Sequence, residues 1–192
     1  MTVGITGGIG SGKSVVSKII ETMGYSVFNS DSESKRLVNN DPVIVNGLTS
    51  LFGPDIYINQ KLNKELLGRI IFSDDDSRLK VNELIHPRVR KAFDDFALNQ
   101  VSGLAFNEAA ILFETDAYKR FDKMILVTSP KELRIQRIMN RDQCSRDEVE
   151  ARMSKQWSDE QKMPLADFII VNDESTPLIE QVEAIINQLT SV

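Results

Sequence analysis

The sequence predicts an α/β fold in which helices cover both faces of a parallel β-sheet. Short apolar runs typical of strands alternate along the chain with segments in which apolar residues recur at helical spacing. The strand-like run near the N-terminus also leads through a glycine-rich turn directly into a helical segment. A length of 192 residues suits one domain of ordinary size, with insertions.

Each expected element follows from its local pattern. Five short apolar runs predict strands: Thr2 to Thr6, Tyr25 to Phe28, a run from Leu104, Lys123 to Ser129, and Phe168 to Asn172. A helix that starts at Lys13 and ends at Gly24 is expected from the helical spacing of Val15, Val16, Ile19, Ile20 and Met23. A closing helix that packs on the sheet is expected from Ile179, Val182, Ile185, Ile186 and Leu189, which share one face.

Two regions interrupt the alternation. Residues 31–101 show mainly helical patterns, with one strand-like stretch, "DIYIN", and are interpreted as a helical insertion. Residues 130–161 are rich in arginine and predict two helices with a break at "RDQC", where Ser145 and Glu148 have the spacing of a capping box. The sheet core is then expected to comprise residues 1–30, 102–129 and 162–192.

Composition narrows the classes of function. A formal net charge of −5 argues against a general nucleic-acid binder. No apolar stretch approaches the about 18 residues that a membrane span needs, and the N-terminus has no signal-peptide pattern, so a cytoplasmic protein without a membrane partner is expected. The single cysteine, Cys144, forms no internal disulfide and fits a reducing compartment. No obligate protein partner is evident.

The glycine-rich turn matches a known phosphate-binding motif. Gly7, Gly12, Lys13 and Ser14 have the G-x-x-x-x-G-K-[ST] spacing between a strand and a helix. Backbone N–H groups from about Gly10 to Val15 should converge on the β-phosphate of a nucleotide at the positive end of the helix dipole. Lys13 should neutralise the β- and γ-phosphates, and the Ser14 hydroxyl should hold Mg²⁺. The expected nucleotide-binding residues of this turn are Gly8, Ile9, Gly10, Ser11, Gly12, Lys13, Ser14 and Val15.

A phosphate loop alone does not distinguish a switch, a motor and a kinase. The sequence has no N-K-x-D segment of a guanine-nucleotide switch, because the nearest string, "NKEL", lacks the aspartate. A motor or remodelling ATPase carries an acidic residue after a strand, and Glu108 and Glu114 keep that alternative open. A small-molecule kinase needs an acceptor-side carboxylate and mobile arginines, and the sequence offers both.

Asp31 is the candidate carboxylate. It lies three residues past the second strand-like run, where a parallel sheet presents its ligands. The alternative is a structural role, because "SDSE" from Ser30 to Glu33 is itself a capping box and an acid in a first helical turn interacts favourably with the helix dipole. The two interpretations have equal support from the residues alone.

Arginines and one histidine are the remaining candidates. Arg134, Arg137 and Arg141 fall on one helical face, which is usually a solvated, salt-bridged face. The break after Arg141 favours instead a two-helix lid that delivers this arginine to the transferring phosphoryl group. His86, the single histidine, is more often a structural residue in such a setting, and a substrate contact is the alternative.

The chain resembles the dephospho-CoA kinases from end to end. "TGGIGSGKS" is similar to the phosphate loop of that family, and Asp31 matches the second aspartate of its D-x-D segment. His86 and Pro87 resemble its H-P marker, and "ILFE" resembles its L-L-x-E segment. "RIMNRD", "RMSKQ" and "AD" followed by "VN" match its lid and closing region.

The resemblance implies a three-layer P-loop kinase fold with an acceptor-binding helical insertion and a helical lid. It implies transfer of the γ-phosphoryl group of ATP to the ribose 3'-hydroxyl of dephospho-CoA, with Mg²⁺ as cofactor and Asp31 as base. Lys13 and Arg141 are expected to be catalytic, Arg141 also to bind ATP, and Asp31, Lys35 and His86 to bind the acceptor. Three positions depart from the family pattern: Val15, Asn29 and Ala110. Asn29 stands where the first aspartate of the D-x-D segment is common in that family.

Overall fold

The computed structural model describes residues 1–191 and divides them into two compact units. The first unit comprises Met1–Asn29 together with the chain from Asn99 onward, and the second comprises Ser30–Leu98.

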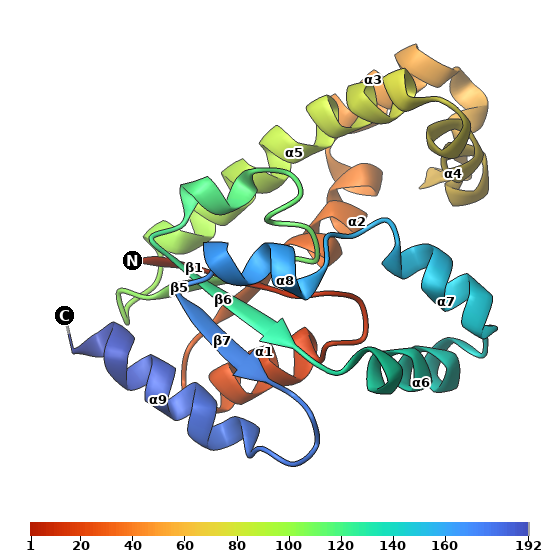
Figure 1. Ribbon diagram of the computed structural model, residues 1–192. Coiled ribbons are helices and arrows are strands. Elements are labelled where there is room, and N and C mark those ends of the chain that lie inside the picture. Colours follow the sequence, from red (N-terminus) through yellow and green to blue (C-terminus); the bar gives the residue numbers. More distant parts are fainter. Residues whose placement is uncertain (192) are drawn as a thin grey trace. The chain divides into compact units, whose positions relative to one another are not determined.

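The first unit is built on a parallel sheet. Its strands are β1 (Thr2–Thr6), β2 (Val27–Asn29), β5 (Ala105–Glu108), β6 (Lys123–Thr128) and β7 (Phe168–Val171). They pair in the order β2-β5-β1-β6-β7, and every pairing is parallel (Figure 1). The predicted α/β fold class with a parallel sheet is therefore confirmed. The carboxyl ends of the strands lie at one edge, where β1 runs into the glycine-rich turn.

The second strand begins later than the sequence predicts. Strand β2 starts at Val27 instead of Tyr25. The ring of Tyr25 packs edge-on against Phe106 of β5, with 5.8 Å between the ring centroids. Tyr25 therefore contributes to the core from the connection that precedes the strand.

Helices α1 (Lys13–Thr22) and α9 (Leu178–Thr190) cover one face of the sheet (Figure 1). Alternate residues of the central strands point toward these helices, among them Val3, Ile5, Ile125 and Val127, all of which are almost completely buried. The positions of both helices agree with the predicted apolar stripes. The main core of the protein thus lies between the sheet and this helix pair.

The opposite face of the sheet is covered by shorter segments. Met124 and Leu126 of β6 point to this side, where they pack with Leu112 and Phe113 from the connection that follows β5. This connection includes the 3₁₀ helix η2 (Ala117–Arg120), and η3 (Met163–Leu165) contributes Leu165. This smaller core holds the chain after β5 close to the sheet.

The arginine-rich segment forms helices α6 (Lys131–Asp142), α7 (Arg146–Met153) and α8 (Asp159–Lys162). The predicted capping box is confirmed, because Ser145 and Glu148 bond each other's backbone N–H groups at the start of α7. A small cluster of Ile135, Ile138 and Val149 joins α6 to α7 and includes the side chain of Ile9 from the glycine-rich turn.

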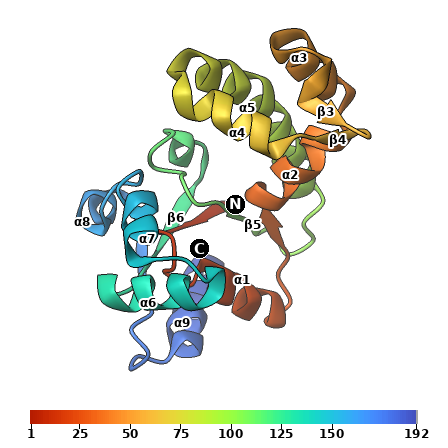
Figure 2. The ribbon, with the colours of Figure 1, turned by 90° about the vertical axis from the view of Figure 1, so that its right-hand side faces the viewer.

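The second unit is mainly helical. It contains α2 (Ser30–Asn40), α3 (Pro42–Phe52), the 3₁₀ helix η1 (Pro54–Ile56), α4 (Lys64–Ser73) and α5 (Asp75–Leu98), and α4 and α5 lie side by side (Figure 2). The strand-like "DIYIN" supplies only β3 (Tyr57–Ile58), which forms a two-residue hairpin with β4 (Lys61–Leu62). The Tyr57 hydroxyl donates a 2.6 Å hydrogen bond to the Val38 carbonyl oxygen and so joins the hairpin to α2.

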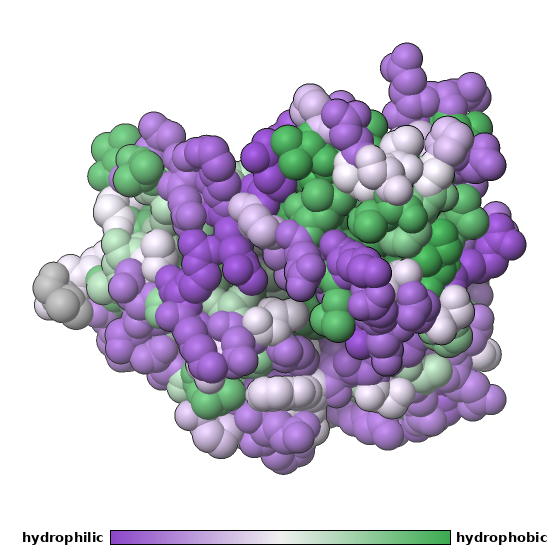
Figure 3. Space-filling view, turned by 90° about the horizontal axis from the view of Figure 1, so that it is seen from above, coloured by the Kyte–Doolittle hydropathy of each residue, from purple (hydrophilic) through white to green (hydrophobic). Residues whose placement is uncertain are grey.

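The face seen in Figure 3 is largely hydrophilic, and hydrophobic side chains gather in limited areas of it. Among the described residues, no helix combines the length and the hydropathy that a membrane-crossing segment requires.

Candidate active site

The glycine-rich turn between β1 and α1 has the geometry of a phosphate loop. Gly12 caps the N-terminus of α1 with φ of 96°, which is a left-handed conformation that favours glycine. A Cβ atom on Gly12 would lie 2.1 Å from Nδ2 of Asn172, which donates a 2.8 Å hydrogen bond to the Ser11 carbonyl oxygen. Both the conformation and the close approach of Asn172 therefore require glycine here.

The loop leaves hydrogen-bond donors available at the positive end of α1. Within the described chain, the N–H groups of Gly10, Gly12 and Ser14 have no acceptor, whereas Ser11 donates to the Gly8 carbonyl oxygen at 3.1 Å. Lys13 Nζ donates to the carbonyl oxygens of Gly7 and Gly8 at 2.8 and 3.3 Å. Unpaired N–H groups, a helix N-terminus and an ammonium group together form a site for an anion such as a phosphate group.

Two side chains at the carboxyl edge of the sheet offer oxygen ligands for a metal ion. They are the hydroxyl of the exposed residue Ser14 and the carboxylate of Glu108. Glu108 ends β5 and stands in register with Ile5 of β1, the strand that leads into the loop. Asn29 Nδ2 donates a 3.2 Å hydrogen bond to Glu108 Oε2, so Asn29 orients a carboxylate. Among the described residues, no group of three acidic, histidine or cysteine side chains could hold a metal. A Mg²⁺ ion held mainly by nucleotide phosphates needs only one or two protein ligands, which these residues fit.

Glu114, the other acidic candidate, is engaged in a buried ion pair. Its Oε1 lies 2.8 Å from Nζ of Lys162, whose side chain is 0% exposed. The same oxygen accepts a 3.1 Å hydrogen bond from the backbone N–H of Trp157. Glu114 therefore joins the chain after β5 to the segment around α8, and Lys162 neutralises its charge.

Two arginines of α6 reach the glycine-rich turn and its surroundings. Arg134 Nε donates a 2.9 Å hydrogen bond to the Ile9 carbonyl oxygen, and its guanidinium packs so closely on Gly8 that a Cβ atom there would lie 1.9 Å from Nη2. Arg137 donates to Ser129 Oγ at 3.1 Å and to Asn172 Oδ1 at 3.2 Å. The sequence predicted Arg134 and Arg137 on one helical face, but neither was among the predicted site residues.

Arg141 is the arginine that the sequence predicts to contact the transferring phosphoryl group. It lies near the C-terminal end of α6, and 63% of its side chain is exposed. It donates to the carboxylate of Asp142 at 2.7 Å, and Arg152 donates to the same carboxylate at 2.8 Å. The hydrogen bond from Arg141, helped by Arg152, lowers the pKa of Asp142 to about 2. The predicted phosphate contact of Arg141 stays a prediction.

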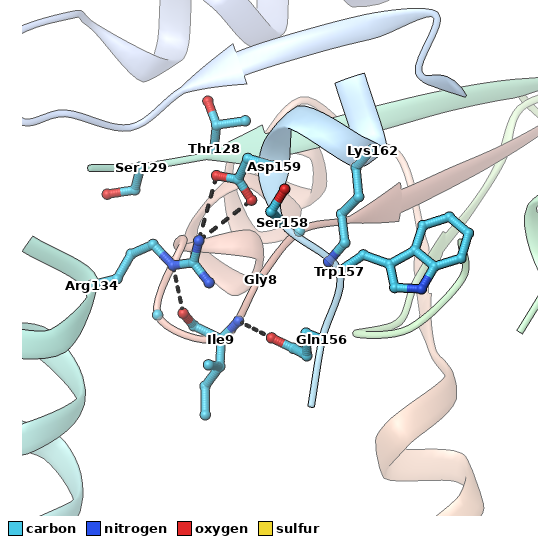
Figure 4. Close-up of polar contacts among 12 residues, drawn as sticks. Gly8, Ile9, Thr128, Ser129, Arg134, Gln156, Trp157, Ser158, Asp159 and Lys162 are labelled. Atoms are coloured by element: carbon cyan, nitrogen blue, oxygen red, sulfur yellow. Dashed lines mark hydrogen bonds and ion pairs between the residues drawn. The ribbon is translucent and has the colours of Figure 1, made fainter. Parts of the chain in front are cut away.

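Two further side chains that sequence reasoning missed come from Gln156, between α7 and α8, and from Asp159, the first residue of α8. Gln156 Oε1 accepts a 2.8 Å hydrogen bond from the Ile9 N–H, and both oxygens of Asp159 lie 3.4 Å from Arg134 Nη1 (Figure 4). Burial raises the pKa of Asp159, although Arg134, Lys162 and Lys13 favour its charged form. The only sequence signal for Gln156 is its place in the "RMSKQ" string.

The candidate acceptor residues belong to the second unit. Asp31 is exposed in the first turn of α2, and Glu33 of the same turn accepts hydrogen bonds from Arg36 at 2.7 and 2.8 Å. Lys35 is also exposed on α2. Their roles toward an acceptor stay predictions.

His86 lines a groove of about 250 Å³ along α5, together with Leu79, Asn82, Glu83, Pro87 and Arg90. Burial and the nearby Arg90 guanidinium lower the pKa of His86, so this side chain is mainly neutral at pH 7. A neutral imidazole has one N–H donor and one acceptor nitrogen for a polar ligand.

Comparison with known proteins assigns the chain to a family. A sequence profile described as dephospho-CoA kinase matches residues 1–177. The chain belongs to the dephospho-CoA kinase family. A dephospho-CoA kinase of Bacteroides fragilis is 42% identical over 184 residues, which cover 94% of this chain and 88% of that relative. The resemblance found in the sequence is thereby confirmed.

Solved structures agree with the dephospho-CoA kinase assignment. A crystal structure of a Thermus thermophilus protein has a TM-score of 0.86 and 31% identity, with 100% of this chain and 96% of that chain covered. The dephospho-CoA kinase from Campylobacter jejuni has a TM-score of 0.71 and 26% identity, with 99% of this chain and 97% of that chain covered. The likeness extends over both units of the chain.

Proposed function

We propose that this member of the dephospho-CoA kinase family transfers the γ-phosphoryl group of ATP to the ribose 3'-hydroxyl of dephospho-CoA, giving coenzyme A and ADP. The observation that carries the proposal is the phosphate loop, with its available N–H groups and Lys13, in a chain of this family. A cytoplasmic location and the lack of nucleic-acid, membrane or obligate protein partners are part of the proposal.

The loop residues bind and orient the donor. N–H groups at the start of α1 and Lys13 Nζ neutralise the β- and γ-phosphates, and the carbonyl oxygens of Gly7 and Gly8 orient this ammonium group. Arg141 supplies positive charge to the transferring group when the arginine-rich segment closes. Each of these interactions strengthens as charge develops in the transition state.

The acceptor residues activate the hydroxyl group. A ribose hydroxyl is a weak nucleophile, and Asp31 accepts its proton as the new bond to phosphorus forms. Lys35 and His86 bind other parts of the acceptor. Because Asp31 is exposed in the first turn of α2, its carboxylate is accessible to a ligand.

The Ser14 hydroxyl and the Glu108 carboxylate are the groups of this chain that would hold Mg²⁺. When bound with ATP, the ion would neutralise phosphate charge. Asn29 keeps the Glu108 carboxylate oriented by its hydrogen bond.

A coupled assay that follows ADP release tests the proposal. We expect ADP release from ATP and Mg²⁺ to depend on dephospho-CoA, with adenosine and shikimate giving at most about 1% of that rate because neither offers the complete acceptor. Slow hydrolysis that does not depend on any acceptor would contradict the proposal and indicate a nucleotide-dependent binding module.

A further inference from the structure

Ile9 of the phosphate loop is held from two sides by side chains that lie far away in the sequence. Its N–H donates to Gln156 Oε1 at 2.8 Å, and its carbonyl oxygen accepts from Arg134 Nε at 2.9 Å. Figure 4 shows Arg134 and Gln156 approaching Ile9 from opposite sides. Both backbone groups of one loop residue are thus satisfied by the arginine-rich segment.

Apart from these two hydrogen bonds, the restraint on Ile9 comes from its side chain. Ile9 lies between Gly8 and Gly10, so its neighbours have unusual backbone freedom, and it belongs to no strand or helix. Its side chain packs with Ile135, Ile138 and Val149. Hydrogen bonds to both backbone groups of Ile9 therefore fix the orientation of the peptide units from which the following phosphate-binding N–H groups extend.

Arg134 and the chain next to Gln156 are held by other residues. Arg134 is 8% exposed and pairs with Asp159 at 3.4 Å. Trp157, which follows Gln156 directly, is held through its backbone N–H by Glu114, and Glu114 pairs with the buried Lys162. Figure 4 shows the contact between Arg134 and Asp159 beside the two hydrogen bonds of Ile9. Both segments that supply the hydrogen-bond partners of Ile9 thus make further contacts of their own.

We propose that Arg134 and Gln156 are positioning residues that hold Ile9 and thereby keep the phosphate loop in its anion-binding conformation. The proposal depends on the proposed function in one respect, which is that the loop binds a nucleotide. It adds that nucleotide affinity depends on two side chains of the arginine-rich segment that act through Ile9.

The test uses two substitutions and a matched control. Gln156→Leu removes the acceptor for the Ile9 N–H, and Arg134→Leu removes the donor to its carbonyl oxygen. Gln136→Leu makes the same change at an exposed glutamine of α6. We expect isothermal titration calorimetry with ADP and Mg²⁺, below the melting temperature, to give a Kd raised about tenfold for each of the first two variants. The control should stay within about twofold of wild type.

Two further readouts separate positioning from general stability. Amide hydrogen exchange at the Ile9 N–H should accelerate in Gln156→Leu and not in Gln136→Leu. The double variant Gln156→Leu/Arg134→Leu should raise the Kd by less than the product of the single effects, because both substitutions release the same residue. If Arg134→Leu does not fold, Arg134→Lys keeps the charge but not the planar guanidinium, and should still raise the Kd.

An unchanged ADP affinity in folded variants whose Ile9 N–H exchanges faster would overturn the proposal, because the loop would then bind nucleotide without this support. Failure of the proposed function gives a different result: wild-type protein would bind ADP but would not phosphorylate dephospho-CoA.

Discussion

At the scale of single residues, the proposed chemistry depends most on Asp31. Its carboxylate is exposed in the first turn of α2. The structural alternative is the role of a first-turn acid within the Ser30 to Glu33 helix start, where Asp31 interacts favourably with the helix dipole. Asparagine separates the two roles, because it keeps the shape of the side chain but cannot accept the proton.

For Asp31→Asn we predict a fall in kcat of roughly 10²- to 10⁴-fold, with ATP affinity and melting temperature close to wild type. Steady-state kinetics, calorimetry with ATP and thermal unfolding measure the three quantities. If the residue only stabilises the helix, the variant should lose a few tenths to about 1 kcal/mol of stability and keep normal turnover. In that case Glu108 is the remaining candidate base, because Glu114 is paired with buried Lys162.

At the scale of elements, the Glu114–Lys162 ion pair joins the chain after β5 to α8. Both partners are withdrawn from water, so removal of one charge leaves the other uncompensated. Lys162→Met should lower the free energy of unfolding by about 3–5 kcal/mol, as measured by urea denaturation. Lys18→Met, which removes an exposed partner of Glu21, should cost less than about 1 kcal/mol.

The double variant Glu114→Gln/Lys162→Met checks the physical reason for this loss. Glutamine can still accept the hydrogen bond from the Trp157 N–H, but it leaves no unpaired charge. The double variant should therefore be more stable than Lys162→Met alone. Equal losses in the two variants would mean that packing, and not the uncompensated carboxylate, accounts for the effect.

Helix α5 carries a pH-dependent contribution to stability. Burial and Arg90 lower the pKa of His86 below its usual value of 6.5, so the unfolded chain binds a proton more readily than the folded one. This contribution is complete above pH 6.5 and is lost as the pH falls through 6.5 toward the lowered value. In urea denaturation between pH 7.5 and 5.5, stability should decrease less steeply for His86→Gln than for wild type. Identical slopes would show that His86 does not titrate in this way.

At the scale of the whole molecule, the sequence predicted the elements that depend on local pattern. The strand Thr2–Thr6, the loop and α1 follow from β-branched residues, glycines and helical spacing, and α9 follows from its apolar stripe. The start of β2 was predicted two residues too early. Tyr25 extends the apolar run in the sequence, but in the structure it lies in the connection before the strand and packs on Phe106 from there.

Local sequence patterns could not predict the contacts around Ile9. Arg134 and Gln156 are separated from Ile9 by 125 and 147 positions, so no spacing rule relates them. An arginine on a helical face is usually solvated, and only the placement of α6 against the loop distinguishes buried Arg134 from exposed Arg141. The sequence identified the type of site but not the residues that support it.

The arginine-rich segment, residues 130–161, is predicted to close over the bound substrates. Amide exchange in α7 should slow when ATP or a non-hydrolysable analogue and dephospho-CoA are both present, whereas exchange in α9 should not change. Arg141→Ala should lower kcat by about 10³-fold if this arginine contacts the phosphoryl group. Equal protection of α7 with and without both ligands, together with normal turnover of the variant, would contradict lid closure.

The most direct test of the whole account is identification of the product. Purified protein should be incubated with ATP, Mg²⁺ and dephospho-CoA, and the product analysed by ³¹P NMR and mass spectrometry. The account predicts one ADP for each molecule of acceptor consumed, a new phosphomonoester on the ribose 3'-oxygen, and no such product with Lys13→Ala. Phosphorylation at another position, or ADP formed with release of inorganic phosphate and no change in dephospho-CoA, would contradict it.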